Sequence, residues 1–394
     1  MAEWKECTIG DLCSTISETY KGTDEFVILV NTSDVLDGKV LNHRLVENKK
    51  LKGQFKKTFR KNDILYSEIR PANRRFAFVD FDNTSNYVAS TKLMVLRHND
   101  AVLPEFLFAL LKSNYIISKL QHLAETRSGT FPQITFSSEL APMKVSFPDK
   151  KIQRQIVNII SSIEKKIDIN EKINNNLLAQ VQLLFESIYL SGNTAKMSDL
   201  ICEIESGSRP KGGALSQGIP SIGAEKIESF GSYDFSSEKY ISEEFFAKLK
   251  RGIVKSSDVL LYKDGAYTGK VSMALDGFPH EICAVNEHVF ILRTYYYRFQ
   301  NYLYCCLSKK EIRDMVFALA SSKAAQPGLN QNEVMGIEIN LPAEDILTSF
   351  EDTVSPLMHL VASNANENKR LSELRDSLLP KLMSGELSVS EIDL

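Results

Sequence analysis

The sequence lacks the features of a membrane or exported protein. No apolar run among its 394 residues approaches the length that crosses a bilayer, and the start, MAEWKECTIG, has no apolar core of a signal peptide. Its 6 cysteines include no C-x-x-C pair, which favours reduced, buried thiols over a zinc or redox motif. We therefore expect a cytoplasmic protein that has no membrane partner.

Motifs of the common catalytic classes are missing as well. No two prolines are adjacent, which excludes the Asn/Asp-Pro-Pro-aromatic loop of a DNA methyltransferase. The stretch GSRPKGG (207–213) lacks the spacing of a phosphate-binding G-x-x-x-x-G-K-[ST] loop and is typical of a turn. No serine or cysteine sits in a nucleophile elbow. We predict a non-catalytic chain that binds no cofactor.

Two metal-site hypotheses are weak. His280, Cys283 and His288 match no common zinc spacing. A nuclease-like set of Asp149, Glu164 and Lys166 places its last two members on a predicted helix beside apolar positions, from which they cannot converge on a metal. We expect no metal site.

An excess of positive charge is also absent. The formal net charge is −3, which argues against a uniformly basic DNA-coating protein but leaves room for a local basic surface. With 43% hydrophobic and 25% charged residues, the chain is typical of a globular protein of two or three domains.

What the sequence does contain is a long internal repeat. KNDILYSE (61–68) resembles SSDVLLYK (256–263), SFPDKKI (146–152) resembles NLPAEDI (340–346), and IGDLCSTI (9–16) resembles MSDLICEI (197–204). In each copy, short β-branched and aromatic runs precede helical segments, a polar loop, a last strand and a long helix. We predict an α+β protein with a pseudo-twofold internal repeat, divided into a domain at 1–149, a helix within 150–191, a domain at 192–343, and a helix with a C-terminal tail at 344–394.

The two long helices carry matching heptad seams. Steps of four and three from Ile156 reach mainly apolar residues, and the same pattern recurs from Phe350. Such a sustained seam is typical of a coiled coil. Both seams contain two asparagines near the middle, which favour one register because a buried amide needs a polar partner. An antiparallel coiled coil would let these asparagines face each other: Asn170, Asn174, Asn364 and Asn368.

Each helix would be on the order of 55 Å long and would act as a spacer. Pro356 is expected to kink the second helix or delay its start, and Pro380 to mark its last turn, with Gly385 beyond. Apolar residues off the seam predict a surface for partner subunits: Leu178, Leu183, Phe185, Leu374 and Leu379.

Two similar domains on a spacer suit a target with two parts, such as DNA half-sites. Arginine suits guanine, asparagine and glutamine suit adenine, and lysine, serine and threonine suit phosphate. The polar loops of the first domain supply the candidates Arg70, Asn73, Arg74, Arg75, Arg127, Ser128, Thr130 and Gln133. Those of the second domain supply Lys263, Tyr267, Thr268, Lys270, Lys323, Gln326, Asn330 and Gln331. Any one of them is also compatible with an ordinary solvated loop.

Over essentially its full length the chain resembles the specificity subunits of type I restriction-modification enzymes. The resemblance rests on Phe147-Pro148 followed by KIQRQIVNIISSI, on LLPKLMSGEL (378–387), and on GTFPQI and QPGLNQ before the last strand of each copy. AEDILTSF departs from the usual Gln-rich start of the second helix, so that junction is expected to differ.

This resemblance implies two target recognition domains that read a split sequence in double-stranded DNA. It also implies two methyltransferase subunits on the helices and restriction (translocase) subunits in the full complex. S-adenosylmethionine, ATP and Mg would then be bound by these partners. The alternative is a coiled-coil scaffold for protein interactions with no role in DNA binding.

Overall fold

The computed structural model describes residues 4–49, 53–127, 132–265, 267–322, 328–389 and 392. Contacts group the chain into two compact units, Met1–Glu164 with Glu373–Leu394, and Lys165–Ser372. Each of the two long helices therefore contributes one part of its length to each unit. Within the described ranges, no helix is long and apolar enough to cross a membrane.

The first unit is a mixed α+β domain. Its strands are β1 (Lys5–Thr8), β2 (Cys13–Ile16), β3 (Phe26–Val30), β4 (Val35–Leu36), β5 (Lys39–Val40), β6 (Val46–Glu47), β7 (Phe55–Lys57), β8 (Ile64–Ser67), β9 (Phe76–Phe78), β10 (Tyr87–Ser90), β11 (Leu93–His98) and β12 (Lys144–Phe147). Its helices are α1 (Pro104–Leu111), α2 (Asn114–Arg127), the 3-10 turn η3 (Pro71–Asn73) and the π-helical η4 (Phe136–Leu140), before the start of α3 (Lys150–Tyr189).

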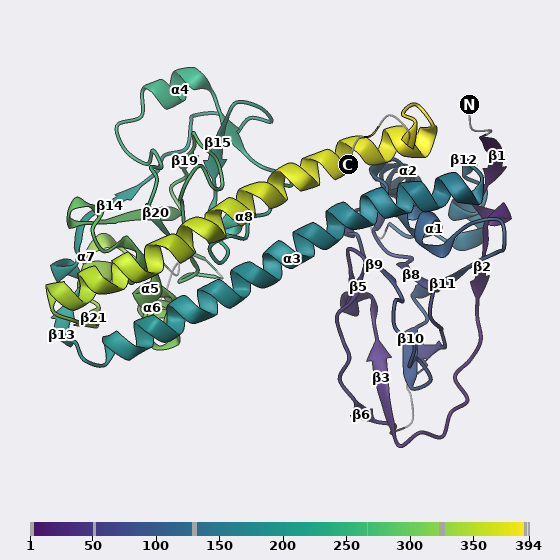
Figure 1. Cartoon of the computed structure of the whole chain (residues 1–394), viewed down its shortest axis with the longest axis horizontal. Coiled ribbons are helices and arrows are strands. Elements are labelled where there is room, and N and C mark those ends of the chain that lie inside the picture. The colour runs from purple at the N-terminus through teal and green to yellow at the C-terminus, as the bar shows by residue number, and fades with distance from the viewer. Residues whose placement is uncertain are drawn as a thin grey trace. The chain divides into compact units, whose positions relative to one another are not determined.

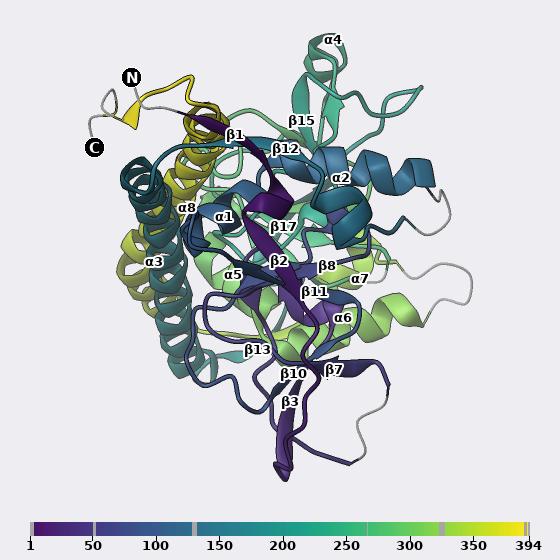
Figure 2. The same cartoon turned by 90° about the vertical axis from the view of Figure 1, so that its right-hand side faces the viewer.

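Two four-stranded sheets form the body of the first unit. One sheet has the order β2-β11-β8-β9 and is antiparallel throughout; the other has the order β6-β3-β10-β7, with β10 parallel to β3. The first and last strands, β1 and β12, pair with each other. Helix α1 packs on β11, and α2 packs on η3. Helices α1 and α2 and strand β11 are labelled in Figure 2.

The second unit contains the other elements. Its strands are β13 (Asn193–Lys196), β14 (Ile201–Ser206), β15 (Ile219–Ile222), β16 (Tyr240–Ile241), β17 (Val259–Tyr262), β18 (Val271–Met273), β19 (Ala284–Val285), β20 (Val289–Thr294) and β21 (Glu338–Leu341). Its helices are α4 (Glu243–Ala247), α5 (Gln300–Ser308), α6 (Lys310–Ser321) and α7 (Gln331–Met335), before the start of α8 (Glu344–Ser384).

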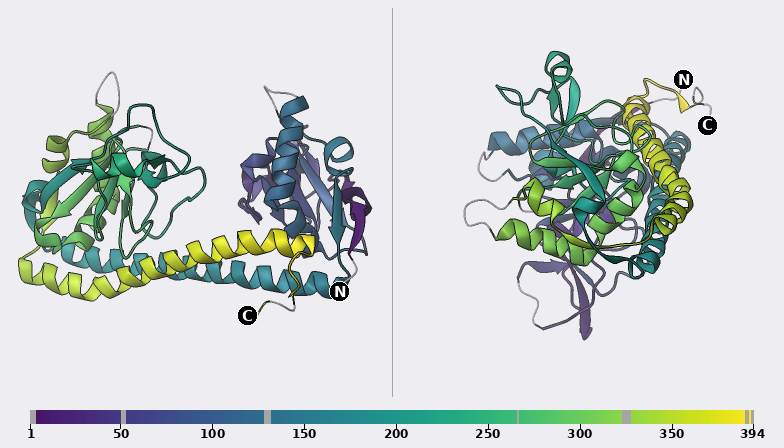
Figure 3. Two further views of the ribbon diagram at one scale, coloured as in Figure 1. Left: turned by 90° about the horizontal axis from the view of Figure 1, so that it is seen from above. Right: turned by 90° about the vertical axis from the view of Figure 1, so that its left-hand side faces the viewer.

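The strands of the second unit repeat the topology of the first. Figure 3 shows the ribbon from two further sides. The order β14-β20-β17-β18 matches β2-β11-β8-β9, and β13 pairs with β21 as β1 pairs with β12. In the smaller sheet β15 runs parallel to β19, as β3 does to β10. The predicted internal repeat and the α+β class are confirmed.

A buried ion pair recurs at one position of both units and explains one of the repeated sequences. The Arg97 guanidinium donates from two nitrogens to the two carboxylate oxygens of Asp63, both at 2.7 Å. Arg293 and Asp258 make the same two-pronged contact, at 2.7 and 2.8 Å. Both carboxylates are buried, and a charge without its partner would be costly there. Asp63 and Asp258 are the aspartates shared by KNDILYSE and SSDVLLYK, and they make the same contact in both units.

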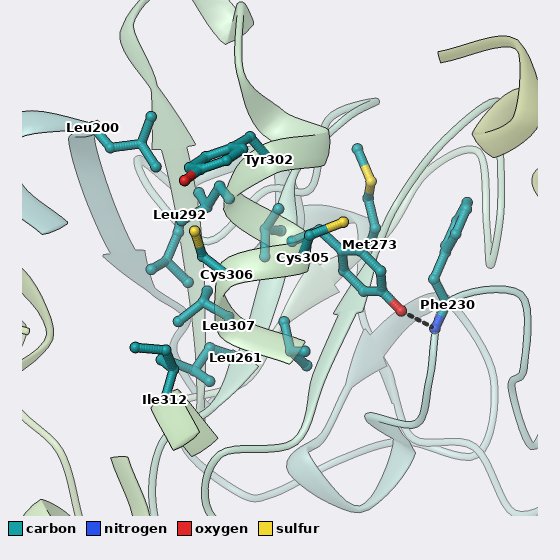
Figure 4. Close-up of a cluster of buried hydrophobic side chains, with 14 of the residues drawn as sticks. Leu200, Phe230, Leu261, Met273, Leu292, Tyr302, Cys305, Cys306, Leu307 and Ile312 are labelled. Atoms are coloured by element: carbon teal, nitrogen blue, oxygen red, sulfur yellow. Dashed lines mark hydrogen bonds between the residues drawn. The ribbon is translucent and has the colours of Figure 1, made fainter. Parts of the chain in front are cut away.

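Helix α5 is buried on all sides, as expected for a helix without a polar face. Tyr302, Cys305 and Cys306 project into the core between the sheet strands, and Figure 4 shows this cluster with the Tyr304 hydroxyl accepting from the Phe230 N–H. Burial raises the pKa of the Cys306 thiol far above its ordinary value. All six cysteines are free thiols, and the prediction of burial holds for four of them but is wrong for Cys202, which is exposed, and for Cys7, which is half-buried.

In the second unit the two long helices run antiparallel (Figure 1), which confirms the predicted coiled coil. The four seam asparagines face one another: Asn170 donates to the side-chain oxygen of Asn368, and Asn364 donates to that of Asn174, both at 2.9 Å. Asn368 also donates to the Ile167 carbonyl at 3.4 Å, and Asn174 donates to the Val361 carbonyl at 3.2 Å. The contacts repeat when the two helices are exchanged.

Three expectations about the helices were wrong or incomplete. Pro356 does not delay α8, which begins at Glu344 and continues through the proline. Phe185 and Leu379 were predicted to be open to partner subunits, but both are buried. Phe185 packs against Tyr189, Tyr302 and Phe350, so the domain itself covers that face of α3. Pro380 does lie in the last part of α8, with Gly385 in the left-handed region at a φ of 76°.

The second junction differs from the first, as expected. At the start of α3 the buried Gln153 accepts from the Leu103 N–H at 2.8 Å and donates to the Pro148 carbonyl at 2.8 Å. In the second unit the anchor is an acid further along α8. Glu351 accepts from the Tyr302 N–H at 2.8 Å and from the Asn301 side chain at 2.7 Å.

Candidate nucleic-acid interface

Three main-chain segments meet at one end of the β2-β11-β8-β9 sheet. The residue after β8, Glu68, donates its N–H to the Lys92 carbonyl in the turn before β11, at 3.0 Å. Its own carbonyl accepts from the Ile134 N–H at 2.8 Å, and Ile69 forms an isolated bridge to Gln133. We call this meeting point the reading edge of the first unit.

The second unit builds the same edge with the same main-chain bonds. Lys263 donates its N–H to the His288 carbonyl at 3.1 Å, and its carbonyl accepts from the Leu329 N–H at 2.8 Å. Asp264 forms the isolated bridge to Gly328. The reading edges of the two units are therefore equivalent in their backbone, segment by segment.

The side chains on this shared frame differ. Glu68 of the first edge is matched by Lys263 of the second, which reverses the charge. The turn residue is Lys92 in one edge and His288 in the other. The two edges therefore share their main-chain bonds and differ in the charges of their side chains.

In the first unit, the predicted residues around η3 fall into two groups. Arg70 and Asn73 are exposed around η3, where Arg70 adopts the left-handed φ of 46°. Arg74 is held by Asp37 at 2.9 Å, and Arg75 donates to the Ser33 carbonyl at 3.1 Å. The first group is free to meet a ligand, whereas the second group fixes the loop.

Of the other predicted residues of the first unit, Gln133 lies at the reading edge and Arg127 pairs elsewhere. Gln133 donates to Glu68 at 3.0 Å, and Glu68 also lies 3.7 Å from the Lys92 ammonium. Arg127, at the end of α2, pairs with Glu139 at 2.9 Å. Ser128 and Thr130 lie outside the described residues.

In the second unit, the hairpin after β17 carries exposed residues. Tyr267 is 64% exposed, and the Lys270 ammonium lies over its ring at 4.8 Å from the centroid while pairing with Glu228 at 2.6 Å. Lys263 lies over the Phe290 ring, 5.0 Å from its centroid. An exposed tyrosine beside a lysine can contact a sugar or base edge and a phosphate together.

Three further predicted residues are engaged in local structure. Thr268 is buried and donates its hydroxyl to the Gly265 carbonyl at 2.8 Å. Asn330 caps α7 by accepting from the Glu333 N–H at 2.9 Å, and Gln331 donates to the Ile204 carbonyl at 2.8 Å. Lys323 and Gln326 lie outside the described residues.

A charged network at the second reading edge was not predicted. The His288 Nδ1 lies 2.7 Å from Asp264, and its Nε2 lies 3.3 Å from Glu287. Glu287 holds Arg209 at 2.9 Å, and Lys263 lies 3.9 Å from Asp264. The five residues come from three distant segments, so no local motif could have revealed them. The pairing of β20 with both β17 and β14 brings them together.

The metal hypotheses gain no support from the described part of the chain, which contains no group of three or more His, Cys, Asp or Glu that could hold a metal ion. His280 pairs with Glu238 at 2.6 Å, and burial raises the pKa of the Cys283 thiol to about 12. Asp149 accepts from the N–H groups of Lys151 and Ile152 at the start of α3.

Comparisons with known proteins agree on one family. The sequence model described as "Type I restriction modification DNA specificity domain" matches residues 1–179. The chain is 31% identical to the HindI specificity subunit of Haemophilus influenzae, across 98% of this chain and 100% of that subunit. It is 22% identical to the MjaIX specificity subunit of Methanocaldococcus jannaschii, across 74% of this chain and 71% of that subunit. A solved S subunit from M. genitalium has a similar fold, with a TM-score of 0.57, 16% identity, and coverage of 97% of this chain and 96% of that one.

Proposed function

We propose that this chain, which belongs to the family of type I restriction-modification specificity subunits, reads a split DNA target with one reading edge for each half. In this family the specificity subunit recognises DNA sequence and is non-catalytic. The chain is therefore a sequence-specific DNA-recognition subunit. The proposal concerns how the recognition is divided between its two units.

The observation that carries the proposal is the shared backbone frame with exchanged side chains. Glu68 and Lys263 make the same main-chain bonds in their units and present opposite charges. Direct recognition of base pairs depends on the pattern of donors and acceptors that side chains present in the major groove. Two edges with one backbone and different side chains would read two different half-sites with one docking geometry.

Each half-site would be contacted by two kinds of group. Arg70 and Asn73 in the first unit and Tyr267 in the second are exposed beside the reading edges, and the half-buried Lys270 lies against Tyr267. We assign the arginine and asparagine to base edges and the lysine to phosphate. The residues that hold their own loops, such as Arg74 and Arg75, position these groups.

The partners follow from the family. We propose that two methyltransferase subunits dock on the helices and that restriction subunits complete the complex. S-adenosylmethionine, ATP and Mg would be bound by these partners. Apolar side chains on the helices remain open to such docking: Leu183 is 72% exposed and Leu374 is 43% exposed.

The methylation pattern of host DNA tests the function. The host with the gene should carry a methylated motif of two separated halves, and the same host with the gene deleted should lose that motif and no other. A deletion strain with an unchanged pattern would contradict the proposal.

The alternative of a scaffold with no DNA role is tested by titrating the chain with duplex DNA at several salt concentrations. A DNA reader should lose affinity steeply with salt, because each phosphate contact releases counterions. A response that is flat with salt would favour the scaffold.

A further inference from the structure

We propose that Arg209 reads a guanine in the half-site of the second unit, and that Glu287 positions it for this task. The inference rests on the proposed function and names one of its base contacts. Arg209 was passed over in the sequence because the loop around it, GSRPKGG, has the composition of a plain turn.

The guanidinium is held in a way that leaves its outer side available. Its Nε lies 2.9 Å from Glu287 Oε1 in an ion pair, and the side chain is 53% exposed. Its Nη2 lies 3.5 Å from His288 Nε2, beside the reading edge. An arginine whose Nε faces a carboxylate keeps N–H groups on both terminal nitrogens. These form the fork that matches O6 and N7 of guanine.

Glu287 is itself fixed from behind. His288 lies between two carboxylates, with Nδ1 at 2.7 Å from Asp264 and Nε2 at 3.3 Å from Glu287. The second oxygen of Glu287 is buried and finds no hydrogen-bond partner among the described residues. A buried carboxylate oxygen without a donor destabilises the fold. Its retention next to an exposed arginine is explained if the carboxylate serves to aim that arginine.

The base of the loop that carries Arg209 is also constrained. Gly207 donates its N–H to the Asn286 carbonyl at 3.2 Å. A Cβ at Gly207 would lie 1.6 Å from the Val285 carbonyl oxygen, so only glycine permits this approach to β19. Arg209 therefore lies two residues after Gly207, whose position beside β19 is fixed. This reduces the conformational entropy that Arg209 loses when it contacts a base.

The test compares methylated motifs produced by variants of the full chain, co-expressed with its own methyltransferase partners in a host without other DNA methylation. The wild type should methylate a split motif with a guanine in one half. Arg209→Ala and Arg209→Lys should both lose discrimination at that single position, by roughly 5- to 150-fold, and leave the other half unchanged. Lysine keeps the charge but lacks the fork.

Arg298 provides the matched control. It is an exposed arginine of the same unit, paired with Glu344 at 2.5 Å, but it follows the opposite end of β20 from the reading edge. Arg298→Ala should produce the wild-type motif. Thermal unfolding of each variant checks that the fold is intact.

Two results would overturn the inference while leaving the proposed function standing. The Arg209 variants could give the wild-type motif, or they could lower methylation evenly over all sequences, which would indicate a phosphate contact. A wild-type chain that produces no split motif would instead overturn the proposed function, and this inference with it.

Glu287→Gln separates positioning from simple structural support. If Glu287 aims Arg209, this variant should relax the same guanine position and no other. The double variant Arg209→Ala/Glu287→Gln should then have the motif of Arg209→Ala alone. A Glu287→Gln motif that loosens at several positions, or at none, would contradict the positioning role.

Discussion

Asn364 donates its side-chain amide to Asn174 at 2.9 Å, across the interface of the two long helices. Each residue sits at a seam position where an apolar side chain would pack better. The amides satisfy one another in this antiparallel register, whereas a shift of one heptad would place at least three of the four opposite leucine, isoleucine or valine. The pair therefore lowers the stability of the helix interface but favours a single alignment of α3 and α8.

Replacing one partner of this pair should destabilise the second unit. Asn174→Ala removes the acceptor of Asn364 and the donor to Val361, and should lower the free energy of unfolding by about 1–3 kcal/mol. Asn174→Leu with Asn364→Leu should recover that loss, since no buried amide remains unpaired. Chemical unfolding measures the free energy of unfolding of both variants. A double leucine variant that is no more stable than Asn174→Ala would contradict the coupling.

Replacing the arginine of a buried ion pair should lower the free energy of unfolding more than replacing a seam asparagine does. Arg97→Ala leaves the Asp63 carboxylate, which is 1% exposed, without its charge partner, and should cost about 3–5 kcal/mol. Asp63→Asn with Arg97→Ala should cost less than Arg97→Ala alone, because no charge stays buried. Unfolding curves of the three proteins test this order, and Arg293→Ala should reproduce the effect in the second unit.

Gly207→Ala should be poorly tolerated for a purely steric reason. The new Cβ would meet the Val285 carbonyl at 1.6 Å, so the loop or β19 must move. We expect a loss of about 2–3 kcal/mol in the free energy of unfolding. Gly212 is the control, because a Cβ there meets nothing within 4 Å. Its φ of 103° still adds some backbone strain, so equal losses at both positions would count against the steric explanation.

The acid that anchors α8 should make stability depend on pH. Burial raises the pKa of the Glu351 carboxyl to about 7, from a model-compound value of 4.5. The folded state therefore keeps a proton that the unfolded state has lost, and stability should fall as pH rises from about 4.5 to about 7. The full effect of this group is about 3 kcal/mol.

Glu351→Gln should flatten this dependence and stabilise the protein at pH 8. The neighbouring Asn301 has a buried side-chain oxygen with no hydrogen-bond partner among the described residues, and an amide at position 351 could donate to it once the Asn301 amide flips. Thermal unfolding at pH 5, 6, 7 and 8 measures both proteins. An unchanged slope in the variant would assign the pH dependence to other groups.

Substitutions at the first reading edge should change a different half of the methylated motif from substitutions at the second. Arg70→Ala, or Asn73→Ala, should change the methylated motif in one half only, and that half should be the one that Arg209 variants leave intact. A single lost base contact should relax one position by about 1–3 kcal/mol. Arg74→Ala is the contrasting variant: it frees the loop from Asp37 and should weaken that half more broadly.

Periodic features were predictable from the sequence because they depend on spacing alone. The seam from Ile156 and its asparagines gave the coiled coil and its direction, and the Asp63 repeat gave the common fold. Phe185 was misjudged because its burial depends on Tyr302 and Phe350, far away in the chain. Helical spacing says which face a residue occupies, but not which domain covers that face.

The site was predictable only in part, for a related reason. Arg70 and Asn73 lie in a polar loop that composition singles out. Arg209, Glu287 and Asp264 are ordinary in their local sequence, and they become a network only when β20 pairs with both β14 and β17. Strand register over long separations, rather than any motif, creates that cluster.

The backbone frame of the reading edges has a consequence for how new targets arise. Since Glu68 and Lys263 are held through their N–H and carbonyl groups, the main-chain bonds between the three segments remain when either side chain is replaced, although a substitution of Glu68 also removes its contacts with Gln133 and Lys92. Substitutions at these two positions can therefore accumulate while each intermediate sequence still folds. A host lineage could thus acquire a new self-recognition sequence through a few point changes, with the rest of the assembly unaltered.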